Sequence, residues 1–129
     1  MLGARHFVYD LIGIMKVYGI ANCNTVKSAR AWLDTRGKSY EFVDYKKLPP
    51  TPELLARWCA EFGWENVLNR RGTTWRMLDP AAQNRIKDEK SAVALMLAKP
   101  SIIKRPIVES GKTLLLGFDE ADFASKLHV

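Results

Sequence analysis

The chain has 129 residues, of which 47% are hydrophobic and 26% charged, and its formal net charge is +6. This length suits one domain with a core of its own, and the composition excludes a disordered chain. No run approaches the ~20 apolar residues of a membrane span, so we expect no membrane partner. The cationic excess is compatible either with an anionic partner or with a basic, solvated surface.

The chain has two cysteines, Cys23 and Cys59, and two histidines, which lie near the chain ends. Neither cysteine has a second cysteine at metal-ligand spacing, so we expect no metal site and no disulfide framework. Residues 1–14 do not resemble a signal peptide, and free cysteines suit a reducing compartment, so a cytoplasmic location is expected. We treat residues 1–14 as an N-terminal extension that a native start at Met15 would leave out, and residues 15–129 as the domain.

The first part of the domain predicts a strand, a helix and a second strand. Residues 14–20 and 39–45 are short and rich in β-branched and aromatic side chains, which is typical of strands. Residues 25–36 place apolar side chains on one face at helical spacing, and Gly37 follows as a stop. Short links between these elements predict a parallel strand pair with a right-handed crossover.

The middle of the chain, about residues 51–99, predicts a helical insertion. Thr51 is a favourable N-cap, Pro52 suits the first turn, and the helix that they begin ends at Gly63. Proline and glycine positions divide the remainder into shorter helices, which we place at residues 75–78, 80–87 and 91–98.

The last part predicts two strands and a closing helix. Ile102 and Ile103 lead through Lys104 into a strand at residues 107–109, and a Ser-Gly turn sends the chain back along residues 112–117 as an antiparallel hairpin. Residues 119–127 predict the helix. This order is the thioredoxin-like plan: an α/β fold with a mixed four-stranded sheet, helices on both faces and a helical insertion.

Cys23 is the most informative residue, because it lies where the first strand ends and the first helix begins. Backbone N–H groups and the helix dipole at such a position favour thiolate over thiol. Asn22 and Thr25 flank it and argue against deep burial, although a small buried apolar residue is the alternative interpretation. Ligands in open α/β sheets bind beyond the carboxyl ends of the parallel strands, which is where Cys23 falls.

The dipeptide Arg105-Pro106 is the second candidate. In thioredoxin-like sheets this position commonly holds a cis-proline beside the active cysteine, so we expect a cis bond here. Arg105 would then lie across from Cys23 and offer a planar fork of donors to an oxyanion or to the thiolate. The alternative is a solvated arginine next to Lys104.

Three further positions bear on the chemistry. Arg70 and Arg71 precede Gly72 and could either clamp an anion or form a plain surface pair. Cys59 follows Trp58 on the apolar side of a predicted helix, so core packing is the expected role. Val26 occupies the place of a second thiol in a Cys-x-x-Cys motif, so Cys23 has no local partner.

These residues together resemble the arsenate reductase (ArsC)-like family over nearly the whole domain. The resemblance rests on Tyr18-Gly19-Ile20-x-Asn22-Cys23-x-Thr25, on Arg71 in the insertion, and on Ile103-Lys104-Arg105-Pro106-Ile107-Val108. It is greatest to the YffB branch, whose members are regarded as candidate glutathione-dependent thiol reductases. The resemblance implies that Cys23 is the nucleophile and Arg105 its catalytic partner, and that the substrate is bound by Arg71, Asn22, Thr25 and Pro106.

The chain departs from two relatives within this resemblance. ArsC-type arsenate reductases have a further arginine on the last strand, whereas the corresponding place here is near Gly117. One oxyanion contact is therefore missing, which weakens the case for arsenate. The Spx regulators bind RNA polymerase and commonly use a Cys-x-x-Cys switch, which Val26 removes here.

The expected activity is that of an oxidoreductase with one nucleophilic cysteine. The Cys23 thiolate would attack a glutathione mixed disulfide or a small oxyanion, and an outside thiol, either glutathione or glutaredoxin, would resolve the adduct. Glutathione is then a co-substrate, and no bound cofactor and no nucleic acid partner are expected. The alternative is an Spx-like, non-catalytic protein-binding regulator.

Overall fold

The computed structural model describes residues 14–128. Our interpretation of residues 1–13 as part of an extension lies outside this range. The described chain divides into two compact units. We call residues 14–43 and 105–128 the sheet unit and residues 44–104 the helical unit, and describe each by itself.

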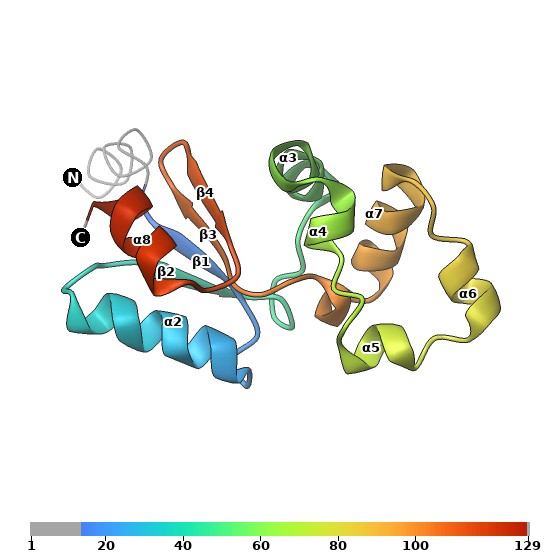
Figure 1. Cartoon of the computed structure of the whole chain (residues 1–129), viewed down its shortest axis with the longest axis horizontal. Coiled ribbons are helices and arrows are strands. Elements are labelled where there is room, and N and C mark those ends of the chain that lie inside the picture. The colour runs from blue at the N-terminus through green and yellow to red at the C-terminus, as the bar shows by residue number, and fades with distance from the viewer. Residues whose placement is uncertain (1–13, 129) are drawn as a thin grey trace. The chain divides into compact units, whose positions relative to one another are not determined.

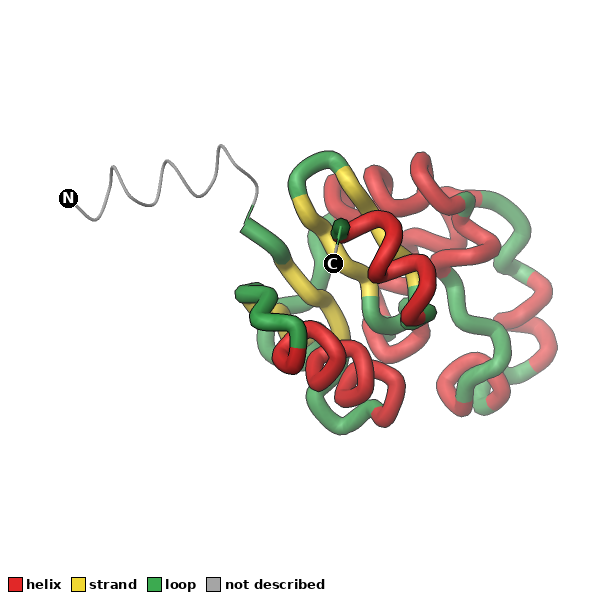
Figure 2. The backbone as a smooth tube through the Cα atoms, turned by 60° about the vertical axis from the view of Figure 1, so that its left-hand side comes forward, coloured by secondary structure: helices red, strands yellow, loops and turns green. Residues whose placement is uncertain are grey.

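The sheet unit contains the four strands of the sheet (Figures 1 and 2). Asp44, the last residue of the second strand, is the first residue of the helical unit. Its elements are β1 (Lys16–Gly19), α2 (Asn24–Thr35), β2 (Glu41–Asp44), β3 (Ile107–Ser110), β4 (Thr113–Leu116) and α8 (Glu120–Leu127). The strand order is β2-β1-β3-β4, with β1 and β3 antiparallel and β3 and β4 antiparallel. Helix α2 makes the crossover from β1 to β2, which is the connection that a parallel pair requires. The mixed sheet confirms the predicted thioredoxin-like fold class.

Helices α2 and α8 pack together on one face of the sheet. The rings of Trp32 in α2 and Phe123 in α8 meet edge to face with centroids 5.7 Å apart. Beneath them lie Val17, Val108 and Leu115, which are paired across three adjacent strands and are buried with the two helices in one core. This shared core fixes the direction of α2, and with it the position of the residue at its N-terminus.

The alternate residues of these strands belong to the opposite face. There the hydroxyl of Tyr18 donates to Oε1 of Glu109 at 3.1 Å, and both side chains are buried. A buried carboxylate needs such a donor. A buried polar group without a hydrogen-bond partner costs roughly 1–3 kcal/mol when it is neutral, and more when it is charged.

The helical unit is built from short helices, as the sequence predicts, but their bounds differ. Its elements are α3 (Pro52–Phe62), α4 (Trp64–Val67), α5 (Thr73–Arg76), α6 (Pro80–Asn84), α7 (Glu89–Ala98) and the 3₁₀ turn η1 (Pro100–Ile102). Thr51 caps α3 as predicted, and its hydroxyl accepts the N–H of Leu54 at 3.2 Å. Leu55, Trp58 and Met96 are fully buried in its interior.

The sequence analysis missed several details of this unit, including helix α4. Helix α7 begins two residues earlier than predicted, because Asp88 and Ser91 form a capping box in which Asp88 Oδ1 accepts the N–H of Ser91 at 2.8 Å. Ile102 lies in η1 and Ile103 forms an isolated antiparallel bridge with Leu68, so neither leads into a strand of the sheet. Strand β3 begins only after Pro106.

Candidate active site

Cys23 is the N-cap residue of α2. Its backbone is extended (φ −136°, ψ 124°) and its carbonyl accepts the N–H of Lys27 at 2.9 Å, which begins the helix. The side chain is half-buried. The thiol therefore lies past the carboxyl end of β1 and at the first turn of α2, where the sequence predicts it, and it is not sealed in the core.

Several groups act on this thiol in opposite directions. Burial by itself raises the pKa of Cys23, whereas the N–H of Val26, the hydrogen bond and charge of Arg105, and the N–H of Thr25 lower it, and the net pKa is below the ordinary value of 9.0. The thiol makes no conventional capping hydrogen bond to the helix. The helix N-terminus and Arg105 thus stabilise the charged form together.

Arg105 reaches Cys23 from the segment before β3. The Arg105-Pro106 bond is cis, which confirms the prediction from its place in the fold. Pro106 is buried, and its carbonyl accepts the N–H of Gly117 at 2.8 Å, so the end of β4 anchors the segment. Gly117 has φ 75°, in the region that favours glycine.

The structure brings together most of the predicted site residues, and they contribute to the site in different ways. Cys23, Arg105 and Pro106 all belong to the sheet unit. Thr25 contributes its backbone N–H to the thiolate. Asn22 is exposed, and its Oδ1 accepts a hydrogen bond from Nζ of Lys27 at 3.5 Å. The substrate contacts predicted for these residues stay predictions.

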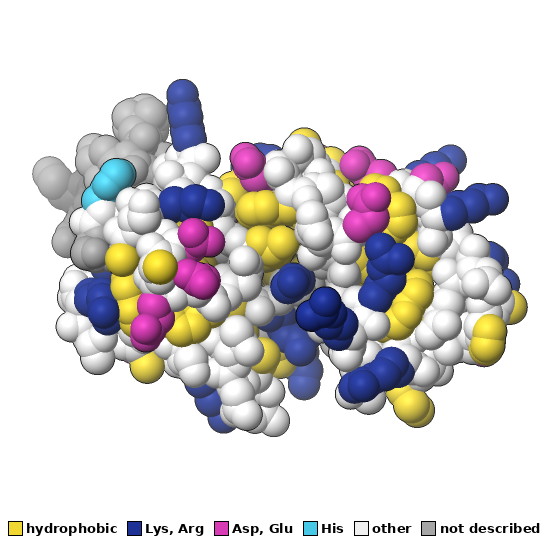
Figure 3. Space-filling model, in the orientation of Figure 1, with side chains coloured by type: hydrophobic (Ala, Val, Ile, Leu, Met, Phe, Trp, Pro, Cys, Tyr) yellow, Lys and Arg dark blue, Asp and Glu magenta, His cyan; other side chains and the backbone are white. Residues whose placement is uncertain are grey.

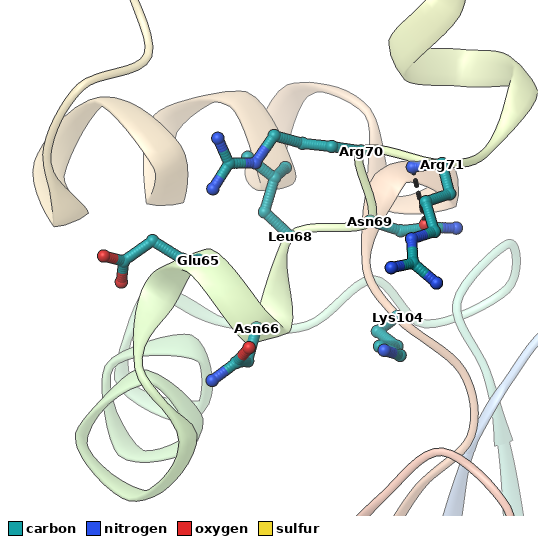
Figure 4. Close-up of a pocket in the computed structure, with 7 residues that line it drawn as sticks. All are labelled: Glu65, Asn66, Leu68, Asn69, Arg70, Arg71 and Lys104. Carbon is teal, nitrogen blue, oxygen red and sulfur yellow. Dashed lines mark hydrogen bonds between the residues drawn. The ribbon is translucent and has the colours of Figure 1, made fainter.

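Lysine and arginine side chains are spread over the face of the molecule shown in Figure 3. Arg71 belongs to the helical unit, where it lines a pocket of about 260 Å³ (Figure 4). The pocket is lined by Glu65, Asn66, Leu68, Asn69, Arg70, Arg71 and Lys104. Sequence reasoning singled out the two arginines but assigned no role to Lys104 or Asn69. The signal that could have identified Lys104 is its position next to another cation, Arg105. The signal for Asn69 is the Asn-x-x-Gly pattern that it forms with Gly72.

Cys59 differs from Cys23 in every respect that governs reactivity. It is 4% exposed, and burial, with a smaller effect of the Glu89 charge, raises the pKa of its thiol to about 11. This confirms the expected core role. Within residues 14–128, no group of three His, Cys, Asp or Glu side chains is placed to hold a metal ion. None of the helices described is long and apolar enough to span a membrane.

Comparison with known families decides the relationship. The model of the ArsC family matches residues 18–125. The chain belongs to the ArsC family. That match covers the end of β1, the Cys23 turn, the helical unit and the Arg105-Pro106 segment, so it includes every candidate site residue.

The chain is similar to two solved structures and to one further protein over most of their lengths. A YffB protein is 50% identical, with a TM-score of 0.84, over 88% of this chain and 98% of its own. An arsenate reductase (ArsC) related protein from Brucella melitensis is 41% identical, with a TM-score of 0.69, over 90% of this chain and 96% of its own. An uncharacterized protein of Haemophilus influenzae is 36% identical over 85% of this chain and 96% of its own. These similarities support the resemblance to the YffB branch.

Proposed function

We propose that the protein is a glutathione-dependent thiol reductase of the cytoplasm in which Cys23 is the nucleophile. The observation that carries the proposal is the contact of Cys23 with Arg105 at the first turn of α2, which lowers the pKa of a half-buried thiol. A thiolate that is both stabilised and accessible is the reactive form in thiol–disulfide exchange. Membership of the ArsC family, whose solved relatives include arsenate reductase-related proteins, supports a thiol-based reductase.

The proposed reaction has two exchange steps. The Cys23 thiolate attacks the glutathione sulfur of a mixed disulfide, the substrate thiolate leaves and takes a proton from solvent, and Cys23 becomes glutathionylated. A second glutathione, as thiolate, then attacks the glutathione sulfur of this adduct, which releases oxidised glutathione and restores Cys23. In the net reaction, one mixed disulfide and one glutathione give the substrate thiol and one molecule of oxidised glutathione, so atoms and electrons balance.

The surrounding groups have distinct roles in these steps. The N–H groups of Val26 and Thr25 keep the sulfur charged before attack and make it a good leaving group afterwards. Arg105 adds a hydrogen bond and a positive charge at the same sulfur, where an anionic substrate would also be stabilised. Arg71 is the proposed contact for an anionic part of the substrate.

The second thiol must come from outside the chain. Val26 fills the position that a local resolving cysteine would take, and Cys59 is buried with a pKa raised to about 11. Glutathione or a glutaredoxin would supply that thiol.

The test is reduction of a glutathione mixed disulfide by the full chain with glutathione as reductant. Cys23→Ser should abolish turnover, and Cys59→Ala, the matched control, should keep it. Mass spectrometry should find a glutathione adduct on Cys23 of the wild type. Turnover by Cys23→Ser near the wild-type rate would contradict the proposal.

Arsenate reduction is the second candidate, supported by the 41% identity to the Brucella melitensis arsenate reductase related protein. Gly117 supplies no side chain where a further arginine is expected, so arsenate would lack one contact. Assays with arsenate and with a mixed disulfide, run side by side with glutathione, separate the two.

A non-catalytic regulator is the alternative to both. The chain is 24% identical to the global transcriptional regulator Spx of Streptococcus mutans over 82% of this chain and 77% of that one. Binding of purified RNA polymerase together with an unreactive Cys23 would favour this alternative, and the lowered pKa of Cys23 argues against an unreactive thiol.

A further inference from the structure

The pocket of the helical unit is assembled by two segments that are distant in sequence. The N–H of Asn69 donates to the carbonyl of Ile102 and the N–H of Lys104 donates to the carbonyl of Val67, each at 2.8 Å. These bonds flank the antiparallel bridge between Leu68 and Ile103. The backbone pairing therefore holds Arg71 and Lys104 at the same pocket, although 33 positions separate them in the sequence (104 − 71).

The backbone at Arg71 is fixed in turn by Asn69. Its Oδ1 accepts the N–H of Arg71 at 3.1 Å, and its side chain lies so close to Gly72 that a Cβ there would come within 2.8 Å of Asn69 Nδ2. Figure 4 shows the guanidinium of Arg71 turned toward Lys104, on the side of the pocket away from Glu65. The fold thus places two positive charges together at one end of the pocket.

The two ends of the pocket differ in character. Arg71 and Lys104 lie at one end, and no ion pair joins either to an acidic side chain within residues 14–128. Glu65 and Asn66 lie at the other, where Nδ2 of Asn66 donates to the carbonyl of Phe62 at 2.7 Å. Arg70 turns to the Trp64 ring, with its guanidinium carbon 5.6 Å from the ring centroid. A ligand that is anionic at one end and carries hydrogen-bond donors at the other would therefore complement both ends of the pocket.

We infer that this pocket binds the carboxylate end of a small zwitterionic peptide, with Arg71 and Lys104 on the carboxylate and Glu65 and Asn66 on its amide or ammonium groups. The inference rests on the proposed function, whose co-substrate, glutathione, is such a peptide. Whole ligands occupy pockets of roughly 300–1,000 Å³. A pocket of about 260 Å³ therefore suits one end of a tripeptide.

The charge pattern favours this ligand over a bare oxyanion. Phosphate or arsenate would use only the cations of the pocket, which include Arg70, whereas a zwitterion would also offer N–H donors to Glu65 and Asn66. Because Arg71, Lys104 and Glu65 are all exposed, solvent screens each contact and the affinity should be modest. We expect a dissociation constant in about the millimolar range, which is adequate for an abundant co-substrate.

Calorimetric titration of the full-length Cys23→Ser variant tests the inference, because this variant binds without reacting. Reduced glutathione should bind, and its diethyl ester, which lacks both carboxylates, should bind on the order of tenfold more weakly. Adding Arg71→Gln or Lys104→Gln should weaken glutathione binding by a similar factor and leave ester binding unchanged. Lys99→Gln, an exposed cation of the same unit outside the pocket, is the matched control and should have no effect.

Two results would overturn the inference. One is equal affinity for glutathione and its ester, or for the Lys104→Gln and Lys99→Gln variants. The other is tighter binding of inorganic phosphate than of glutathione. Circular dichroism melting of each variant confirms that it is folded.

The inference and the proposed function can fail separately. If the wild type does not turn over mixed disulfides but carboxylate-dependent binding persists, only the reductase proposal is lost. If turnover is normal and Lys104→Gln leaves the KM for glutathione unchanged, only the pocket assignment is lost. A raised KM with an unchanged kcat is the result that we expect for Lys104→Gln.

Discussion

Arg105 hydrogen-bonds Cys23 from a segment that lies 82 positions further along the chain (105 − 23). The contact requires two anchors. The core shared by α2 and α8 fixes the N-terminus of α2, and the hydrogen bond from Gly117 to the carbonyl of Pro106 fixes the segment that carries Arg105. Both belong to the sheet unit, so the nucleophile and its cationic partner are positioned by one core.

The first prediction concerns the ionisation of Cys23. Since its pKa is lowered, the thiolate persists to lower pH than that of an ordinary thiol, for which the reference pKa is 9.0. The rate of alkylation by iodoacetamide should therefore show an inflection below that pH. Peptide mapping should find the label on Cys23 alone, because Cys59 is 4% exposed. An inflection at or above 9.0 would contradict activation by the helix and Arg105.

Arg105→Gln should shift this inflection upward, because it removes the positive charge and replaces the guanidinium donor at Cys23. Arg105→Lys keeps the charge and should shift the inflection less. Comparing the two pH profiles separates the effect of charge from that of the guanidinium's geometry. Identical profiles for the wild type and both variants would show that the backbone N–H groups alone set the pKa.

The raised pKa of Cys59 predicts a loss of stability in alkaline solution. In the unfolded chain Cys59 ionises near the ordinary value of 9.0, whereas in the folded chain it keeps its proton to about 11. The folded state then binds more protons, so the free energy of unfolding falls as pH rises from about 9 to about 11. Cys59→Ala should flatten this slope. The measurement is urea unfolding of both proteins at several pH values, and parallel curves would exclude the effect.

Phe123→Ala should destabilise the sheet unit, because Phe123 is 1% exposed and its ring contacts those of Trp32 and Phe118. Truncation of a buried aromatic residue costs about 3–5 kcal/mol through lost burial and the cavity that remains. Phe118→Ala removes a half-buried ring from the same cluster and should cost less. Urea unfolding followed by circular dichroism compares them, and equal losses would contradict the central place of Phe123.

Gly72→Ala should weaken ligand binding at the pocket with little effect on stability. The new Cβ would meet Asn69 Nδ2 at 2.8 Å, and this flexible side chain can rotate away and give up its bond to the N–H of Arg71. Titration with glutathione in the Cys23→Ser background measures the loss. Asn69→Ala should reproduce it, and the double variant should be no weaker than either single one, because both changes break the same contact.

Local patterns were sufficient for much of the fold. The spacing of Val26, Ala29, Trp32 and Leu33 predicts the buried face of α2, and all four are buried. The Thr51 cap and the hairpin of β3 and β4 were likewise predicted, because caps, turns and periodicity depend on neighbouring residues. Helix α4 was missed, since a helix of four residues has too little periodicity to detect.

The position of Cys23 at a helix N-terminus, after a polar turn, could be predicted from local sequence, because residues close in the chain specify that geometry. Only the tertiary structure decided that Arg105 reaches this thiol, and that Lys104 lines one pocket with Arg71. Such contacts depend on the register of distant strands and on a single bridge between Leu68 and Ile103, neither of which leaves a local pattern.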